Sequence, residues 1–166
     1  MNTSQLFDIC KGLRYFGDVV ALDIYMQRKK HRDMCIVNTD PSHLPGKHWF
    51  VVDRTWIPTV VFDSYGVLSP TGTDAFWRGY IKEYISFSAP LQSFSTNVCG
   101  DYSVMYVYLR HKGYSPLWIH SFLQNLCEND HIRDHIVRSV SSSEFNVYVS
   151  SGPHVTAEGD QSCLFL

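Results

Sequence analysis

Long hydrophobic runs are missing from this sequence of 166 residues. No apolar stretch reaches the roughly 18 residues that a membrane span needs, so we expect no transmembrane helix and no membrane partner. The first residues carry no positive charge ahead of an apolar stretch, so no secretory signal is expected either. Internal repeats and low-complexity linkers are also missing. The length then predicts one domain over residues 1–166, which can bury a core without disulfide staples.

A strong net charge is missing as well. Lys and Arg number 14 against 16 Asp and Glu, which gives a formal net charge of −2. This balance argues against a strongly basic protein that binds nucleic acid or a membrane surface. The basic run at residues 27–32 is the only place where we expect contact with nucleic acid, and a solvated loop or helix end is the favoured interpretation of it. Hydrophobic residues make up 45% and charged residues 18%, so the chain is neither disordered nor a coiled coil.

Cysteine pairs with the CxxC spacing of metal and redox sites do not occur. The cysteines are odd in number and widely spread: Cys10, Cys35, Cys99, Cys127 and Cys163. This pattern predicts free thiols in a reducing compartment rather than a disulfide framework. Cys127, His131 and His135 are four residues apart and would share one helix face, a spacing that can bind zinc. No fourth ligand is evident, so we expect a solvated helix end and no metal site.

Three short runs rich in β-branched and aromatic residues predict the strands of one sheet. Each is bounded by Gly, Pro, Asn or Asp, and together they cover residues 34–37, 49–52 and 59–62. Their Val-Val and Val-Phe doublets predict burial on both faces. Residues 18–25 fit a strand or a helix equally well. Residues 86–98 are expected to form a polar loop with a short strand at 91–94.

Helical periodicity surrounds these strands. A Thr3 or Ser4 cap predicts a short amphipathic helix that ends in the Gly12 to Gly17 region, and Ser115-Pro116 caps another. The remaining helical patterns cover residues 73–85, 99–112, 117–127 and 129–140. The last 25 or so residues are polar and are expected to be irregular. A helix, then strands, then helices indicates the α+β class.

Three residues that can carry chemistry lie at the boundaries of these elements. His48 opens one predicted strand, Asp63 ends the next, and Cys99 begins an apolar helix. A cysteine nucleophile needs a base to take its proton and a carboxylate to orient that base, and histidine titrates near neutrality. A helix N-terminus lowers the pKa of a thiol and offers a backbone N–H to an oxyanion. Gln92, in the loop before Cys99, can supply a second, neutral donor.

Each of these residues alone has a simpler explanation. A lone cysteine in an apolar helix is usually a core residue, a lone histidine at a strand start is usually a surface residue, and Asp-Ser-Tyr-Gly is most often a plain turn. Together, in the order His48, Asp63, Gln92 and Cys99, they supply every role in acyl transfer. The papain order is excluded, because there the cysteine precedes the histidine.

The same residues resemble a known family. The motifs His48-Trp49, Asp63-Ser-Tyr-Gly66 and Gln92-x6-Cys99-Gly are similar to those of the adenain-like cysteine proteases, the adenovirus maturation proteases and their relatives in Polinton-type elements and other DNA viruses. The wider group includes the SUMO-deconjugating, Ulp-type proteases. The segment Ile36-Val-Asn-Thr-Asp40 is particularly close to the viral branch. The resemblance runs from about residue 6 to about residue 127 and implies a central mixed β-sheet packed between helices.

The resemblance also implies a role for each motif residue. Cys99 would be the nucleophile, His48 its general base and Asp63 the carboxylate that orients the imidazole. Gln92 would complete the oxyanion hole with the Cys99 backbone N–H. Trp49 would help wall a narrow cleft that accepts Gly-rich sequences near the cut; a plain core tryptophan is the alternative.

Departures from the family limit what is carried over. Asp63 stands where the adenovirus enzymes have Glu, as it does in SUMO proteases. Adenovirus enzymes are activated by a viral peptide that is disulfide-linked to a cysteine upstream of the Gln, and residues 64–98 contain no cysteine. DNA stimulates those basic enzymes, whereas this chain is mildly acidic. We therefore expect no required cofactor, and the sequence argues against activation by peptide or DNA.

The expected function is a monomeric cysteine endopeptidase that cleaves Gly-containing sites in viral capsid or core precursors. By resemblance, it would act inside the host cell, in the nucleus, the virion or both. Two alternatives remain open at this stage. One is a deubiquitinase or SUMO-type protease that cleaves after Gly-Gly, and the other is a catalytically inactive adaptor, against which the intact His48, Asp63, Gln92 and Cys99 argue.

Overall fold

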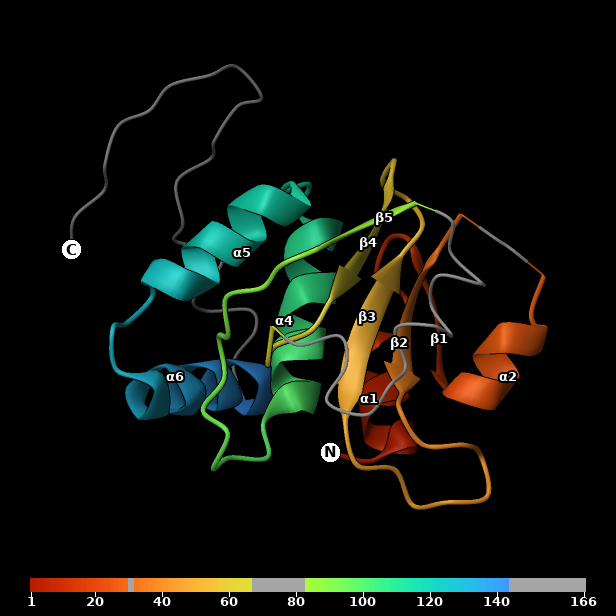
Figure 1. Cartoon of the computed structure of the whole chain (residues 1–166), viewed down its shortest axis with the longest axis horizontal. Coiled ribbons are helices and arrows are strands. Elements are labelled where there is room, and N and C mark those ends of the chain that lie inside the picture. Colours follow the sequence, from red (N-terminus) through yellow and green to blue (C-terminus); the bar gives the residue numbers. More distant parts are fainter. Residues whose placement is uncertain (30–31, 67–82, 144–166) are drawn as a thin grey trace.

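The computed structural model describes residues 1–29, 32–66 and 83–143. Within them a mixed five-stranded sheet is covered by helices, in agreement with the predicted α+β class (Figure 1). The strands are β1 (Phe16–Ala21), β2 (Met34–Asn38), β3 (Trp49–Asp53), β4 (Thr59–Phe62) and β5 (Tyr84–Ser86). The helices are α1 (Thr3–Cys10), α2 (Leu22–Gln27), α4 (Cys99–His111), α5 (Pro116–Asn125) and α6 (Asp130–Ser143). None of the described helices is long and apolar enough to cross a membrane.

The strands lie in the order β1-β2-β3-β4-β5. The outer pairs β1–β2 and β4–β5 are parallel, whereas β3 is antiparallel to both of its neighbours. Helices α1 and α4 pack on one face of the sheet and α2 packs on the other (Figure 1). The expected mixed sheet between helices is therefore present.

The central strands β2 and β3 are buried along their whole length, which confirms the predicted burial on both faces. Successive side chains of a strand point to opposite faces, so alternate residues enter different hydrophobic clusters. Ile36 and Val51 join the larger cluster with Tyr106 of α4. Val52 joins the smaller cluster with Tyr25 of α2.

Helix α4 is buried on all sides from Cys99 to Arg110, as a helix in the middle of a core should be. A buried ion pair ties it to the end of β3: Arg110 Nε lies 2.8 Å from Asp53 Oδ2. The same carboxylate oxygen accepts the Tyr106 hydroxyl at 3.0 Å. These contacts fix α4 against the central strand, and so they fix the position of Cys99 at its first turn.

Two segments for which the sequence predicted a helix, or left strand and helix open, contain strand residues. Residues 18–25 hold the end of β1 and the start of α2, so both readings apply to part of the segment. The end of the helix predicted at 73–85 is wrong, because Tyr84 and Ile85 lie in β5 and pair with β4. Aromatic and β-branched residues fit a half-buried sheet, and this pairing overrides their helical spacing. Residues 73–82 lie outside the described residues.

The short strand predicted at 91–94 is wrong, because this segment is a loop. The backbone N–H groups of Leu91 and Gln92 both donate to the carbonyl of Ser64, at 2.8 and 2.9 Å, instead of joining a ladder. The loop is therefore fastened to the turn that follows β4.

Helix ends differ from prediction at both ends of the chain. Helix α1 is capped by Asn2, whose side chain accepts the Gln5 N–H, and not by Thr3 or Ser4. The irregular tail expected for the last 25 or so residues is wrong at 141–143, because these residues close α6. There the Ser141 hydroxyl hydrogen-bonds the Asp101 carboxylate of α4. Residues 144–166 lie outside the described residues.

Candidate active site

The sequence-predicted residues gather at one end of the sheet. Because β3 and β4 are antiparallel, the start of β3 and the end of β4 lie at the same end of the sheet. His48 directly precedes β3, and Asp63 directly follows β4. Helix α4 packs on β3 and begins at that end with Cys99 (Figure 1). Residues 51 positions apart in the chain therefore meet without any long side-chain reach.

His48 and Asp63 form a close pair. His48 Nε2 lies 2.8 Å from Asp63 Oδ1, and both side chains are largely buried. An ionised carboxylate can only accept, so we infer that Nε2 carries a proton and that Nδ1 is the basic nitrogen of the neutral ring. Asp63 Oδ1 also accepts the backbone N–H of Tyr65 at 2.9 Å, which holds the carboxylate in its turn. The same carboxylate oxygen of Asp63 therefore stabilises the turn and contacts the His48 ring.

Cys99 is the first residue of α4 and is only 7% exposed. His48 Nδ1 is buried and has no hydrogen-bond partner of standard geometry within the described part of the chain. The thiol and the imidazole still interact closely enough for each to shift the pKa of the other. Contacts of this kind are often looser in a free enzyme than in its complex with substrate. Nδ1 is thus the atom placed to accept the Cys99 proton.

The electrostatics of the pair favour a thiolate beside an imidazolium. Burial alone would lower the pKa of His48, but the hydrogen bond and charge of Asp63, together with Cys99, raise it to about 9. Burial alone would raise the pKa of the Cys99 thiol, but His48 and the backbone N–H groups of Trp49 and Gly100 lower it below 9.0. Both shifts therefore act in the same direction, because they favour transfer of the thiol proton to the imidazole.

The N-terminus of α4 offers backbone donors beside the thiol. Val98 caps the helix without a side-chain hydrogen bond, and the first bond inside the helix runs from the Tyr102 N–H to the Val98 carbonyl. The N–H groups of Cys99, Gly100 and Asp101 therefore have no partner within the helix. Such groups stabilise a thiolate and an oxyanion alike.

Gln92 lies beside the site, but its amide is engaged. The residue lies in the loop expected for it, but it is only 1% exposed and therefore belongs to the interior. Nε2 donates to the Thr96 carbonyl at 2.8 Å and to the Tyr65 hydroxyl at 3.1 Å, while Oε1 accepts the Ser64 hydroxyl at 2.8 Å. An amide nitrogen has two N–H groups. Donation to an oxyanion therefore requires Gln92 to release one of these bonds.

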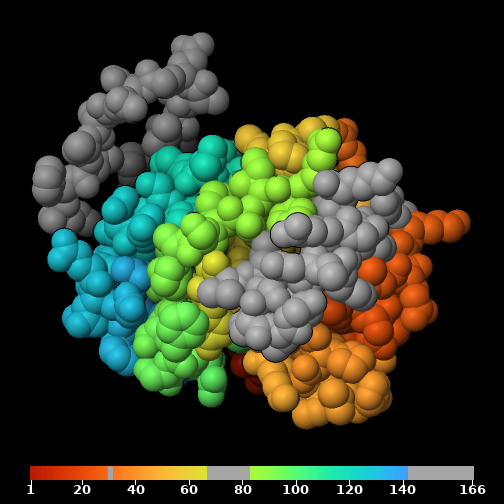
Figure 2. All heavy atoms as spheres, viewed as in Figure 1, coloured from red at the N-terminus to blue at the C-terminus, as the bar shows by residue number. Residues whose placement is uncertain are grey.

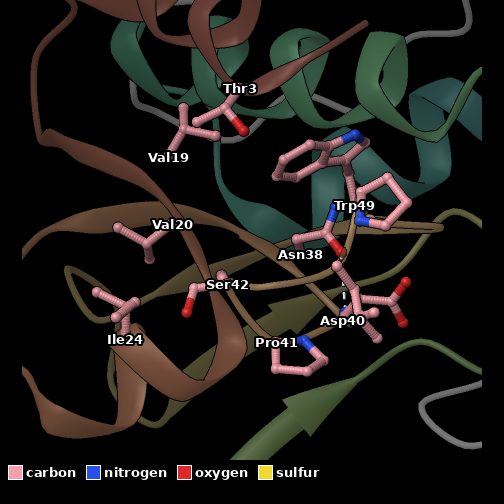
Figure 3. A pocket seen from close by; sticks show the side chains of 13 residues that line it. Thr3, Val19, Val20, Ile24, Asn38, Asp40, Pro41, Ser42 and Trp49 are labelled. Carbon is pink, nitrogen blue, oxygen red and sulfur yellow. Dashed lines mark hydrogen bonds between the residues drawn. The ribbon is translucent and has the colours of Figure 1, made fainter.

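Trp49 is a core residue, which was the alternative considered for it, and its role in a substrate cleft stays a prediction. It belongs to the main hydrophobic cluster, and it lines a cavity of about 290 Å³ between β1, α2 and the loop before β3. Figure 3 shows its indole ring beside Asn38, with Val19 and Val20 also on the lining. A Cβ placed on Gly100 would lie 3.6 Å from the indole, so the ring also reaches the start of α4. Trp49 thus connects the cavity with the surroundings of Cys99.

Tyr65 is a site residue to which the sequence analysis gave no role. Its ring packs on His48, with centroids 4.8 Å apart, and stacks on Phe94 at 5.3 Å. Its hydroxyl donates to the Thr96 carbonyl at 2.9 Å. Tyr65 therefore contacts both the candidate base and the loop before the nucleophile. The available signal was its place two residues after Asp63 in the turn.

The alternative sites of the sequence gain no support from the described residues. In that part of the chain no group of three His, Cys, Asp or Glu side chains is placed to hold a metal ion. His135 Nδ1 instead lies 3.0 Å from the Ser139 hydroxyl of its own helix. In the basic run, Arg28 lies 3.6 Å from Asp18 and 3.4 Å from Asp33, which gives it a structural role.

No protein-family model matches this chain, and a search of curated proteins finds no match. The chemical interpretation therefore depends on the site itself. A thiol of lowered pKa, an oriented imidazole and a row of backbone donors suit acyl transfer through a thioester.

Proposed function

We propose that this chain is an adenain-like cysteine endopeptidase that cleaves Gly-rich sites in viral precursor proteins. One observation carries the chemistry: Asp63 holds His48 through Nε2, which leaves Nδ1 for the thiol of Cys99 at a helix N-terminus. The mixed sheet between helices and the order of the motifs support the adenain-like assignment, which comes from the resemblance of the sequence.

The proposed reaction has two stages. The Cys99 thiolate attacks the carbonyl carbon of the scissile peptide bond, and the Cys99 N–H stabilises the oxyanion, joined by Gln92 when its amide leaves Tyr65. The imidazolium of His48 gives its proton to the leaving amine, the C–N bond breaks and a thioester remains on Cys99. His48 then takes a proton from water, which hydrolyses the thioester, and the thiol and imidazole return to their first state.

The surroundings of the thiol support small residues at the cut. Cys99 and Trp49 are 7% and 8% exposed, so side chains beside the scissile bond find little room, and glycine needs none. The cavity of about 290 Å³ next to Trp49 offers space for one larger side chain farther along the peptide. Viral capsid or core precursors as substrates rest on the resemblance alone.

Cleavage profiling on a peptide library tests this proposal. We expect hydrolysis next to glycine by the wild-type chain and none by Cys99→Ala or by enzyme pretreated with iodoacetamide. Cys127→Ala is the matched control, because Cys127 precedes α6 and its side chain has no part in the site. Parallel reactions with DNA and with virion peptides test activation.

Each result of the profiling has a distinct meaning. If the library peptides stay intact but ubiquitin-like proteins ending in Gly-Gly, added as separate substrates, are cleaved, the proposal moves to a deconjugating protease. Absence of any hydrolysis, together with slow alkylation of Cys99, would refute a thiol enzyme.

A further inference from the structure

The loop before the nucleophile is fastened to a helix far along the chain. We call residues 91–98 the nucleophile loop, because it leads into Cys99. In Figure 2 the segment from β5 into this loop crosses the face of the molecule in light green. Asp134 of α6 approaches the loop from inside and is only 3% exposed.

The Asp134 carboxylate accepts three donors around the nucleophile loop. Its Oδ2 accepts the Thr96 hydroxyl at 2.5 Å and the Ser93 backbone N–H at 3.2 Å. Its Oδ1 accepts the Tyr102 hydroxyl of α4 at 2.9 Å. A buried carboxylate is tolerated only when hydrogen bonds replace the water it has lost, and these three do so. Asp134 therefore ties the nucleophile loop to both α4 and α6.

Thr96 carries this attachment to the site. Its hydroxyl is held by Asp134, while its carbonyl accepts Gln92 Nε2 at 2.8 Å and the Tyr65 hydroxyl at 2.9 Å. One residue thus joins Asp134 to the candidate oxyanion donor and to the aromatic ring that packs on His48. If Thr96 shifts, the Gln92 amide loses the acceptor that orients it.

We propose that Asp134 is a positioning residue, which sets Thr96 and thereby orients the amide of Gln92, the candidate oxyanion donor. The predicted effect on turnover rests on the proposed function, whereas the effect on the order of the loop does not. His48 and Asp63 are placed by β3 and β4, so they should not depend on Asp134.

Hydrogen exchange of the full chain, measured by mass spectrometry, tests the structural part of the proposal. Asp134→Ala should speed exchange of the Leu91, Gln92 and Thr96 amides, whose backbone bonds run to Ser64 and Ser93. His135→Ala is the matched control on the same helix, because this side chain is exposed and its ring nitrogen pairs with the Ser139 hydroxyl of α6 itself. It should leave exchange of the nucleophile loop unchanged.

The conservative variant Asp134→Asn should restore the loop. Its amide oxygen can accept the Ser93 N–H, and its N–H groups can donate to a hydroxyl. The hydroxyls of Thr96 and Tyr102 have other acceptors in reach, the Ser93 carbonyl at 3.0 Å and the Leu91 carbonyl at 2.9 Å. We therefore expect Asp134→Asn to exchange like the wild type and to keep most of its turnover.

Kinetics test the link to catalysis. Asp134→Ala should lower kcat by about 10–100-fold, because small displacements of a catalytic group cost that much. KM should change little, and the alkylation rate of Cys99 should stay within about twofold, since burial, His48 and the backbone N–H groups of Trp49 and Gly100 set the pKa of its thiol. A general loss of structure would instead lower the alkylation rate as well.

Three results would count against the inference or its premise. Unchanged exchange in Asp134→Ala would overturn the positioning role, and faster exchange with unchanged kcat would overturn its link to catalysis. A wild-type chain that cleaves no peptide, but whose loop loosens in Asp134→Ala, would refute the proposed function and leave the positioning of the loop intact. Should Asp134→Ala fail to fold, Thr96→Val is the second variant, because it removes the hydroxyl that Asp134 holds and keeps the carbonyl. Its loop exchange and kcat are then judged by the same criteria.

Discussion

The two halves of the candidate site are built in different ways. His48 and Asp63 stand on neighbouring strands, and the backbone ladder between β3 and β4 sets their separation. The nucleophile loop has no ladder and depends on hydrogen bonds of its own Gln92 side chain and of Tyr65 and Asp134, two residues from separate segments. The strand half is therefore fixed by the fold, whereas the loop half can be disturbed by single polar substitutions. The pairing of thiol and base should survive damage to the loop.

Removal of the base should have the largest effect. His48→Ala is expected to lower turnover by about 10⁴–10⁶-fold, because His48 is the side chain that interacts with the Cys99 thiol in the described part of the chain. The same change should raise the pKa of the Cys99 thiol and slow its alkylation by iodoacetamide at neutral pH. Turnover and brief labelling followed by mass spectrometry measure both.

Buried thiols elsewhere in the chain serve as internal controls for this labelling. Burial raises the pKa of Cys10 and of Cys35 to about 12. Both should react slowly in the wild type and in His48→Ala, whereas Cys99 should react quickly only in the wild type. Equal labelling of Cys10 and Cys99 in the wild type would contradict the activation of Cys99 by His48.

Asp63→Asn should change how the reactivity of Cys99 depends on pH. Asp63 raises the pKa of His48 through its hydrogen bond and charge, so its loss should lower that pKa from about 9. With less imidazolium beside it, the Cys99 thiol should need a higher pH to ionise. Turnover should fall by about 10³–10⁴-fold, since the ring also loses the partner that selects its tautomer.

Alkylation rates from pH 5 to pH 10 measure this change. In the wild type the lowered pKa of Cys99 should bring the onset of alkylation to lower pH than for an ordinary thiol, and His48 should stay an imidazolium until the pH passes about 9. In Asp63→Asn the onset of alkylation should move to higher pH and the upper inflection should move to lower pH. Identical profiles for the two proteins would show that Asp63 does not act on His48.

The same contrast explains how much could be predicted from sequence. The positions of His48, Asp63 and Cys99 follow from local patterns that mark the ends of strands and the start of a helix, and those elements are present. The loop half depends on contacts between segments that no local pattern connects. Asp134, 35 residues after Cys99, and the burial of Gln92 belong to this half.

Gln92→Ala tests the loop half directly. If Gln92 donates to the oxyanion, turnover should fall by about 10²–10³-fold with little change in KM, because that bond is made only as charge develops. Its burial adds an expectation for stability: the Ser64 hydroxyl and the Thr96 carbonyl each lose a partner, which costs about 1–3 kcal/mol in the free energy of unfolding. Kinetics and urea unfolding measure the two effects.

Ser95→Ala is the matched control for this variant, because Ser95 lies exposed in the same loop. It should leave turnover and the free energy of unfolding close to those of the wild type. A Gln92→Ala protein that loses stability while keeping its turnover would make Gln92 a structural residue and leave the oxyanion to backbone N–H groups.

Tyr65→Phe should have the smallest effect, because it changes the loop half and keeps the ring that packs on His48. The lost hydroxyl donates to Thr96 and accepts from Gln92, so the free energy of unfolding should fall by about 1 kcal/mol. Turnover should change by less than about tenfold, which corresponds to about 1.4 kcal/mol. The loss of turnover should be smaller than in Gln92→Ala, because removal of the Tyr65 hydroxyl frees one Gln92 N–H for the oxyanion. A loss as large as that of Gln92→Ala would instead mean that Gln92 acts only while Tyr65 holds it in place.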